Sequence, residues 1–188
     1  RRQGTAVGAE RGTSSPIIDH ADVRRLLMTQ RAWIDAMRCL VYANAAAIDR
    51  SKTGSGAEAE AAREVAELYT PLSKGLCTDV GNEMTSLAVQ VHGGMGFVEE
   101  TGVAQHYRDI RIAAIYEGTN GIQAADLVGR KLPMRGGAVV GEQLDLVDAV
   151  AAQLAATEDL KGFGQQLEAA SAATRRATEW VLTNAPTN

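Results

Sequence analysis

The segment IYEGTNGIQ at residues 115–123 places one carboxylate, Glu117, between an aromatic residue and a glycine. Thr119 is suited to cap a helix that starts just after it. A helix start offers unpaired N–H groups and a partial positive charge, which suit an anion or a polarised carbonyl oxygen. Glu117 is therefore either a solvated charge that serves the helix dipole or a base held in a dry pocket. The pattern alone favours the solvated charge.

A second segment, QVHGGMGF at residues 90–97, ends a helical pattern at Gly93 and Gly94. Glycines let backbone N–H groups come close to a phosphate or a flat ring. The alternative is a plain helix stop followed by a turn, because glycine commonly follows the last turn of a helix. The spacing alone favours this plain stop.

The other candidates for chemistry are weaker. The three histidines, His20, His92 and His106, lie far apart, and no order of Ser, His and Asp suggests a catalytic triad. We interpret His92, beside the glycines, as a hydrogen-bonding loop residue and not as a catalyst. The segment YRDIR at residues 107–111 is typical of surface ion pairs, each worth about 0–1 kcal/mol.

Helices must position these segments, because apolar residues recur at three- and four-residue steps along most of the chain. The predicted helical segments are 22–50, 61–69, 71–92, 103–110, 119–132, 139–154 and 163–181. The segment SKTGSGAEAE at residues 51–60 indicates a flexible link after the first of them.

The dipeptide Thr70-Pro71 interrupts the second helical pattern. Thr at an N-cap followed by Pro at the first helical position is a recognised start signal. We therefore predict that one helix ends near Tyr69 and that another begins at Pro71. A single kinked helix is the alternative.

These patterns favour an all-α fold, an antiparallel helical bundle with a C-terminal helical appendage. Hydrophobic residues make up 45% of the chain and aromatic residues only 4%, which favours helices over a β-sandwich. Pro133 and the pair Gly136-Gly137 indicate a boundary. We expect the bundle to occupy residues 1–132 and the additional helical domain to occupy residues 133–188.

Composition excludes several classes of protein. The formal charge is −4 and no dense basic run occurs, so we expect no nucleic-acid binding. No stretch approaches the roughly 20 apolar residues of a membrane span. Cys39 and Cys77 have no metal-ligand spacing, so we expect no metal site, and the chain should be reduced and cytoplasmic. The first residue is Arg and not Met, which suggests a piece of a longer protein.

Two motifs in this order give the chain a family resemblance. The segment QVHGGMGF is similar to the Gln-x-x-Gly-Gly-x-Gly-aromatic segment of acyl-CoA dehydrogenases, and IYEGTNGIQ is similar to their Tyr-Glu-Gly-Thr segment. The run YRDIR fits as well, and the resemblance covers roughly residues 1–132, as the C-terminal helical domain of that family. Residues 133–188 resemble the extra helical domain of a long subgroup that includes 3-methylmercaptopropionyl-CoA dehydrogenases.

The resemblance implies roles for the residues around the carboxylate. Glu117 matches the catalytic base of the family, and Gly118 lies beside the substrate thioester. Thr119 matches a residue that contacts FAD. Gly121 stands at a further cofactor-contacting position, where many members have Gln, so any side-chain contact there is lost or moved. Many members also have Gln where this chain has Ala21.

The resemblance also implies a second group of cofactor-binding residues. Gln90, Gly93 and Gly94 match the segment that holds the adenine end of the FAD bound by a neighbouring subunit. An arginine near the start reaches the FAD phosphates in the family, and we assign that role to Arg1 in preference to Arg2.

The implied activity is the α,β-desaturation of an acyl-CoA thioester, with FAD as hydride acceptor. The implied partners are an acyl-CoA substrate, an electron acceptor such as a flavoprotein, and further subunits in a homodimer or homotetramer. The middle β-domain and the N-terminal helices of the family are missing, so we expect the isolated chain to bind FAD poorly and to be inactive. The alternatives are a flavoprotein relative with another role and a non-catalytic helical interaction module.

Overall fold

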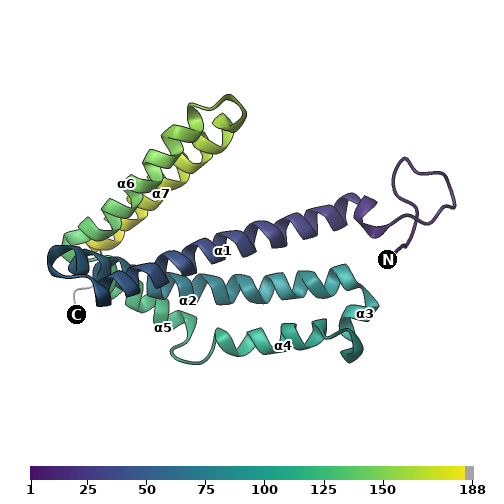
Figure 1. Cartoon of the computed structure of the whole chain (residues 1–188), viewed down its shortest axis with the longest axis horizontal. Coiled ribbons are helices and arrows are strands. Elements are labelled where there is room, and N and C mark those ends of the chain that lie inside the picture. The colour runs from purple at the N-terminus through teal and green to yellow at the C-terminus, as the bar shows by residue number, and fades with distance from the viewer. Residues whose placement is uncertain (185–188) are drawn as a thin grey trace. The chain divides into compact units, whose positions relative to one another are not determined.

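The computed structural model describes residues 1–184, and this part of the chain is helical (Figure 1). It contains seven α-helices, and no β-strand occurs within the described residues beyond an isolated bridge between Arg2 and Pro16. The predicted all-α class is therefore confirmed.

The chain divides into two compact units. Unit 1 consists of residues 1–43 and 73–120, and unit 2 consists of residues 44–72 together with the described residues from 121 onward. Two long helices contribute to both units: α1 spans Ala21–Thr53 and α2 spans Gly56–His92. The predicted boundary near residue 132 does not coincide with this division, and the assignment of residues 133–188 to an additional domain stays a prediction.

The link between α1 and α2 is shorter than the sequence pattern indicated. Only Gly54 and Ser55 lie outside the two helices, whereas a flexible segment was predicted for residues 51–60. The sequence GAEAE is already helical, because Ala and Glu are strong helix formers and continue directly into the amphipathic pattern of α2.

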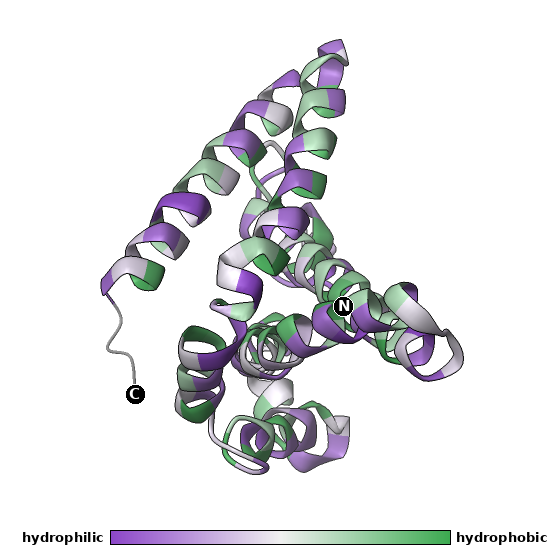
Figure 2. Ribbon diagram, turned by 90° about the vertical axis from the view of Figure 1, so that its left-hand side faces the viewer, coloured by the Kyte–Doolittle hydropathy of each residue, from purple (hydrophilic) through white to green (hydrophobic). Residues whose placement is uncertain are grey.

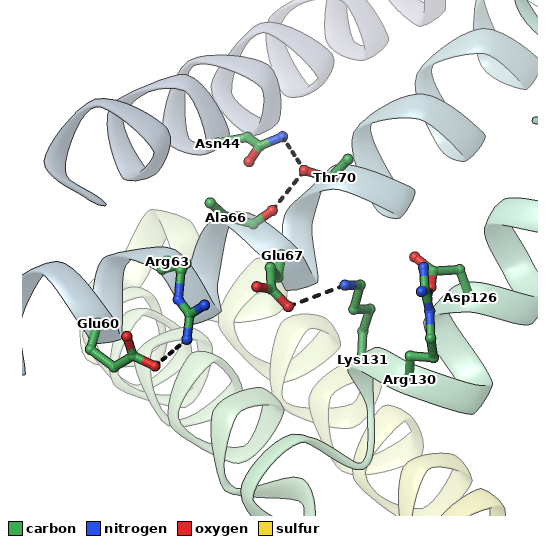
Figure 3. A network of polar contacts seen from close by, with 9 residues as sticks. All are labelled: Asn44, Glu60, Arg63, Ala66, Glu67, Thr70, Asp126, Arg130 and Lys131. Atoms are coloured by element: carbon green, nitrogen blue, oxygen red, sulfur yellow. Dashed lines mark hydrogen bonds and ion pairs between the residues drawn. The ribbon is translucent and has the colours of Figure 1, made fainter. Parts of the chain in front are cut away.

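Helix α2 is continuous through Pro71, so the prediction of two separate helices was wrong and the single-helix alternative was correct. Proline lacks the N–H that a helix interior normally uses. The missing N–H would have served the Glu67 carbonyl. Just before Pro71, the Thr70 hydroxyl donates to the Ala66 carbonyl at 2.7 Å, and Asn44 of α1 donates to the Thr70 oxygen at 3.4 Å (Figure 3). Pro71 is buried, so its ring also contributes to packing.

In unit 1, α1, α2 and α4 run in alternating directions along the chain, as an antiparallel bundle requires (Figure 1). The short helix α3 covers Gly94–Phe97, and α4 covers Val103–Ala113. Helix α4 packs closely on α2 at Gly81, where an added Cβ would lie 3.1 Å from the Ile110 side chain. The buried apolar residues of this unit include Leu26, Val80 and Met84.

In unit 2, α5 (Asn120–Asp126) leads through a π-helical turn at Leu127–Lys131 to α6 (Ala138–Ala155) and α7 (Lys161–Asn184). Helices α6 and α7 form an antiparallel pair (Figure 1). Their backbones come close at Gly164, where an added Cβ would lie 2.4 Å from the Ala155 nitrogen. The alternation of apolar and polar residues along both helices is visible in Figure 2.

The core of unit 2 forms around Leu68 of α2 and Val139 and Val140 of α6. The Tyr69 hydroxyl beside this cluster donates a 2.7 Å hydrogen bond to Gln143, and burial raises the pKa of Tyr69. At the edge, Lys131 pairs with Glu67 at 3.2 Å (Figure 3). Unit 2 therefore has a small apolar centre with polar contacts around it, and a hollow of about 350 Å³ lies beside Leu68 and Val140.

No helix among residues 1–184 is both long enough and apolar enough to cross a membrane.

Candidate functional site

The predicted carboxylate lies in a short loop between α4 and α5, residues 114–119, which we call the Glu117 loop. Its first turn closes on α4, because the N–H groups of Ile115 and Tyr116 both donate to the Ile112 carbonyl, at 2.9 and 3.1 Å. Its far end is tied back to its start by the Asn120 N–H, which donates to the Ala114 carbonyl at 3.3 Å. The loop is therefore closed at its base and presents Glu117 at its tip.

The backbone at the tip has an unusual conformation. Glu117 has a φ of 53° and Gly118 has a φ of 85°. Positive φ is uncommon for a residue other than glycine, because its Cβ then crowds the following carbonyl. Such residues cluster at functional sites, where the surrounding structure holds them in place.

The carboxylate is not sheltered by the described residues. Glu117 is exposed, and so are the apolar neighbours Ile112, Ile115 and Tyr116, at 55%, 47% and 50%. The dry pocket considered from the sequence is therefore not formed by residues 1–184. The apolar side chains around Glu117 have no covering element in this part of the chain.

Asn120, which the sequence analysis did not single out, ties the Glu117 loop to α2. Its Oδ1 accepts from the Lys74 ammonium group at 2.8 Å, and its Nδ2 donates to the Thr78 hydroxyl at 2.9 Å and to the Asp79 carboxylate at 2.7 Å. A further bond joins Nδ2 to the Gly75 carbonyl at 3.2 Å. These partners precede Asn120 by 41 to 46 residues, so no local pattern in the sequence could reveal them.

Thr119 directly precedes α5, at the N-cap position that the sequence indicated. Gly118 and Thr119 are both exposed. Gly121 is the second residue of α5 and belongs to unit 2.

The second predicted segment forms the end of α2, which stops at His92 as expected. The ring of His92 contacts the Ala88 carbonyl at 2.9 Å, so His92 forms a hydrogen bond as predicted, but it lies in the last turn of α2 and not in a loop. Gly93 has φ and ψ values of 64° and −146° and precedes the short helix α3, which begins at Gly94. Gln90 and Gly94 are exposed.

Arg1 lies against this helix end. Its guanidinium group donates to the His92 carbonyl at 2.7 Å and contacts the Val91 carbonyl at 3.5 Å. The positive φ of Gly93 favours glycine at this position, and an added Cβ would come within 2.8 Å of a nitrogen of the flexible Arg1 side chain, which would then have to shift. The structure thus places Arg1 and Gly93 together, as two residues that the sequence analysis had grouped.

The two predicted segments lie at opposite ends of α4 (Figure 1). Helix α4 has 11 residues, which corresponds to about 16 Å at 1.5 Å per residue. The Glu117 loop and the Arg1–Gly93 contact are therefore separate places on unit 1.

A cleft of about 1000 Å³ lies between α1, α2 and α4 of unit 1. Its walls include Trp33 and Tyr107, and Arg108 and Arg111 of the YRDIR segment line it as well. Arg108 pairs with Glu99 at 2.8 Å, and both side chains are more than half exposed, as expected for a surface ion pair. Neither Glu117 nor Gly93 lines this cleft.

Within the residues that the structure describes, no group of three His, Cys, Asp or Glu side chains could hold a metal ion. Cys39 is exposed, Cys77 is partly buried, and both are free thiols. Burial raises the pKa of the Cys77 thiol.

Comparison with known proteins places these segments in a family. A family model described as acyl-CoA dehydrogenase, C-terminal domain, matches residues 6–132. The 3-methylmercaptopropionyl-CoA dehydrogenase of Ruegeria pomeroyi is 44% identical over 154 residues, which cover 82% of this chain and 26% of that protein. A butyryl-CoA dehydrogenase of Syntrophomonas wolfei is 41% identical over 128 residues, or 68% of this chain and 21% of that protein.

A more distant relative is the caffeyl-CoA reductase-Etf complex subunit CarC of Acetobacterium woodii. It is 32% identical over 116 residues, which cover 62% of this chain and 27% of that protein. The chain thus spans about a quarter of the length of these relatives. The family model covers most of the chain, including Gly93, Glu117 and Asn120, so the chain belongs to the acyl-CoA dehydrogenase family and carries its C-terminal domain.

Proposed function

We propose that this chain supplies the base-bearing helical part of a flavin-dependent enzyme that desaturates an acyl-CoA thioester between its α- and β-carbons. The observation that carries the proposal is the Glu117 loop. It presents a carboxylate at the tip of a closed turn with positive φ, inside the region that matches the family domain.

The chemistry requires such a group, because the α-hydrogen of a thioester is a very weak acid. A base within hydrogen-bond reach must remove it while the carbonyl oxygen is polarised. In our proposal Glu117 accepts this proton, and N–H groups aimed at the thioester oxygen stabilise the developing enolate. FAD supplies the hydride acceptor for the β-carbon when it is bound.

The role of Gly118 and Thr119 in this proposal is to border the substrate and the cofactor. Both are exposed next to Glu117, so they are accessible to a bound molecule. Gly118 has no side chain to separate the backbone from a thioester. Gly121 follows in α5 and adds no side chain toward a cofactor.

The Arg1–Gly93 contact suits the phosphate and adenine portion of FAD. Arginine carries five N–H donors, and the carbonyls of His92 and Val91 engage only part of them. The exposed Gln90 side chain and the exposed backbone at Gly94 lie on the same helix end. These groups are of the kind that recognise phosphates and rings.

In this proposal the two places contact two different flavins, as the family resemblance implies. The length of α4, about 16 Å, lies between the Glu117 loop and the Gly93 segment. We therefore propose that Glu117 faces the flavin ring of its own subunit, whereas Arg1, Gln90, Gly93 and Gly94 contact the FAD of a neighbouring subunit. Such sharing requires a homodimer or a homotetramer.

The electrons leave the flavin through a further protein in this proposal. The name of the Acetobacterium woodii relative records a complex with Etf, and an electron-transfer flavoprotein is the corresponding acceptor here. We also propose a cytoplasmic location, consistent with the two free thiols. The isolated 188-residue chain should bind FAD poorly and be inactive, because the Glu117 loop has no cover within residues 1–184.

The test is the Glu117→Gln variant of the complete protein that contains this chain. It should retain FAD and lose acyl-CoA oxidation, because the amide keeps the shape of the side chain but cannot accept the α-proton. Flavin absorbance and acyl-CoA-dependent reduction of an artificial electron acceptor measure the two properties. Near-normal turnover by this variant would remove Glu117 as the base.

A further inference from the structure

We propose that Asn120 is the positioning residue for the catalytic carboxylate of Glu117. The inference rests on the proposed function, and it adds a residue to which no role had been assigned. Asn120 is partly buried and stands three residues after Glu117. Its backbone N–H bonds to the start of the Glu117 loop, and its side chain bonds to α2.

The backbone of Asn120 closes the loop. Its N–H donates to the carbonyl of Ala114, the residue that follows the last turn of α4. Ala114 is buried, so the start of the loop is fixed by packing. The hydrogen bond from Asn120 to Ala114 therefore holds the end of the loop close to its fixed start.

The side chain of Asn120 fixes the closed loop to α2. Lys74 presents a donor and Asp79 presents an acceptor, and the amide meets both at 2.8 and 2.7 Å. Lysine has no acceptor and a carboxylate has no donor, so the bridging group must both accept and donate. Among side chains of this length only Asn does so, because Asp lacks the donor and Leu lacks both.

The strained backbone at the tip depends on these attachments. Glu117 has a positive φ, and a residue other than glycine keeps such a conformation only when its surroundings hold it there. With both ends of the loop fixed, the carboxylate has a defined direction. Without the side-chain amide of Asn120, the loop can relax and the carboxylate moves relative to the substrate.

The main experiment compares Asn120→Ala with Asn82→Ala in the complete protein. Asn82 is the control because it is an asparagine of α2 whose amide donates within that helix, to the Thr78 carbonyl at 2.7 Å, and not to a residue of the loop. Misplacement of a reacting group by about 1 Å costs on the order of 100-fold in rate. We expect Asn120→Ala to lower kcat by about 10- to 100-fold, with KM for acyl-CoA and FAD content nearly unchanged.

An isotope effect separates positioning from general loss of structure. With an α-deuterated acyl-CoA, the effect on the rate of flavin reduction should rise in Asn120→Ala, because proton removal becomes slower than the other steps. It should be unchanged in Asn82→Ala. Equal losses of kcat in the two variants, with the same isotope effect, would overturn the proposal.

A reciprocal exchange of side chains covers the case in which Asn120→Ala fails to fold. Asn120→Asp alone places two carboxylates against each other at Asp79 and should lose kcat strongly. The double variant Asn120→Asp/Asp79→Asn restores a donor and an acceptor between positions 120 and 79 in the reverse order, and it should recover part of the kcat lost by Asn120→Asp, although the bond to the Gly75 carbonyl is not restored. A double variant no more active than Asn120→Asp would contradict the proposal.

The failure of this inference differs from the failure of the proposed function. An inactive Glu117→Gln variant together with normal kcat and a normal isotope effect in Asn120→Ala overturns the role of Asn120 alone. An active Glu117→Gln variant removes the base itself, and with it the group that Asn120 is proposed to position.

Discussion

Two regions of the chain hold their shape by different means. In unit 2, Leu68 and Val139 are only 2% and 1% exposed, and they belong to an apolar core. Around the Glu117 loop of unit 1, Ile115 and Tyr116 are about half exposed, and polar bonds from Asn120 fix the loop. The difference indicates that unit 2 is stabilised by burial, whereas the loop is shaped by a few directional contacts and left open.

The largest effect should come from the core of unit 2. Replacing Leu68 by Ala should lower the free energy of unfolding by about 2–5 kcal/mol, because a buried leucine leaves both lost burial and a cavity. The matched change Ile115→Ala should cost less than about 1 kcal/mol, since Ile115 is already half exposed. Chemical denaturation measures both, and equal losses would abolish the distinction between the two regions.

The close approach of α6 and α7 is tested by adding volume to unit 2, whereas Leu68→Ala removes it. Gly164→Ala should cost about 1–3 kcal/mol, because the new methyl group meets the backbone of Ala151 and Ala155. Gly162→Ala, with open space around it in the same helix, should stabilise the protein by about 0.5–1 kcal/mol. Thermal unfolding measures both changes in stability. If both variants were stabilised, or both destabilised, the predicted packing would be refuted.

The backbone of the Glu117 loop is tested by Gly118→Ala. Because Gly118 has a φ of 85°, an alanine there should cost about 1–2 kcal/mol in the free energy of unfolding. Gly129→Ala is the control, since Gly129 has no such φ and nothing near its added Cβ. In the complete protein, Gly118→Ala should also lower kcat. If Gly118→Ala left the free energy of unfolding unchanged, the positive φ at Gly118 would be contradicted.

The smallest effect concerns an exposed ion pair of unit 2 and its pH dependence. The hydrogen bond from Arg135, at 2.8 Å, lowers the pKa of Glu142 below its ordinary value. A carboxyl group with a lowered pKa in the folded state stabilises the fold above its unfolded pKa of about 4.3, and this contribution is lost as the pH falls through the folded pKa. Glu142→Gln should therefore reduce stability slightly at neutral pH and make no difference well below pH 4.

The comparison of unfolding free energies at pH 7 and pH 3 checks this sign. Arg135→Gln should also reduce the free energy of unfolding at neutral pH. It removes a second ion pair as well, because Arg135 also contacts Glu64 at 2.9 Å. A loss in Glu142→Gln that is larger at pH 3 than at pH 7 would contradict the assignment.

The sequence alone was sufficient for the helices whose signals are local. The apolar periodicity of α1, α4, α6 and α7 and the stop of α2 at Gly93 depend on neighbouring residues, and the structure confirms them. The break predicted at Pro71 was wrong, because α2 continues through this buried proline, and tertiary packing outweighs the local propensity of one residue.

The candidate site was predictable only in part, for the same reason. The positions of the Glu117 loop and of the Gly93 segment followed from short motifs, but the contacts of Asn120 join residues more than 40 positions apart. Glu117 is exposed within residues 1–184, and the shelter that we propose for it would come from outside this part of the chain. Local patterns therefore locate a candidate carboxylate, whereas its orientation and its solvent exposure are properties of the folded structure.

The most direct test is a structure of the complete protein with FAD and a non-reactive acyl-CoA analogue. The account predicts that the Glu117 carboxylate, exposed in this chain, becomes covered and lies about 3–3.5 Å from the thioester α-carbon. A Glu117 side chain that still faces water, with another group beside the α-carbon, would contradict it.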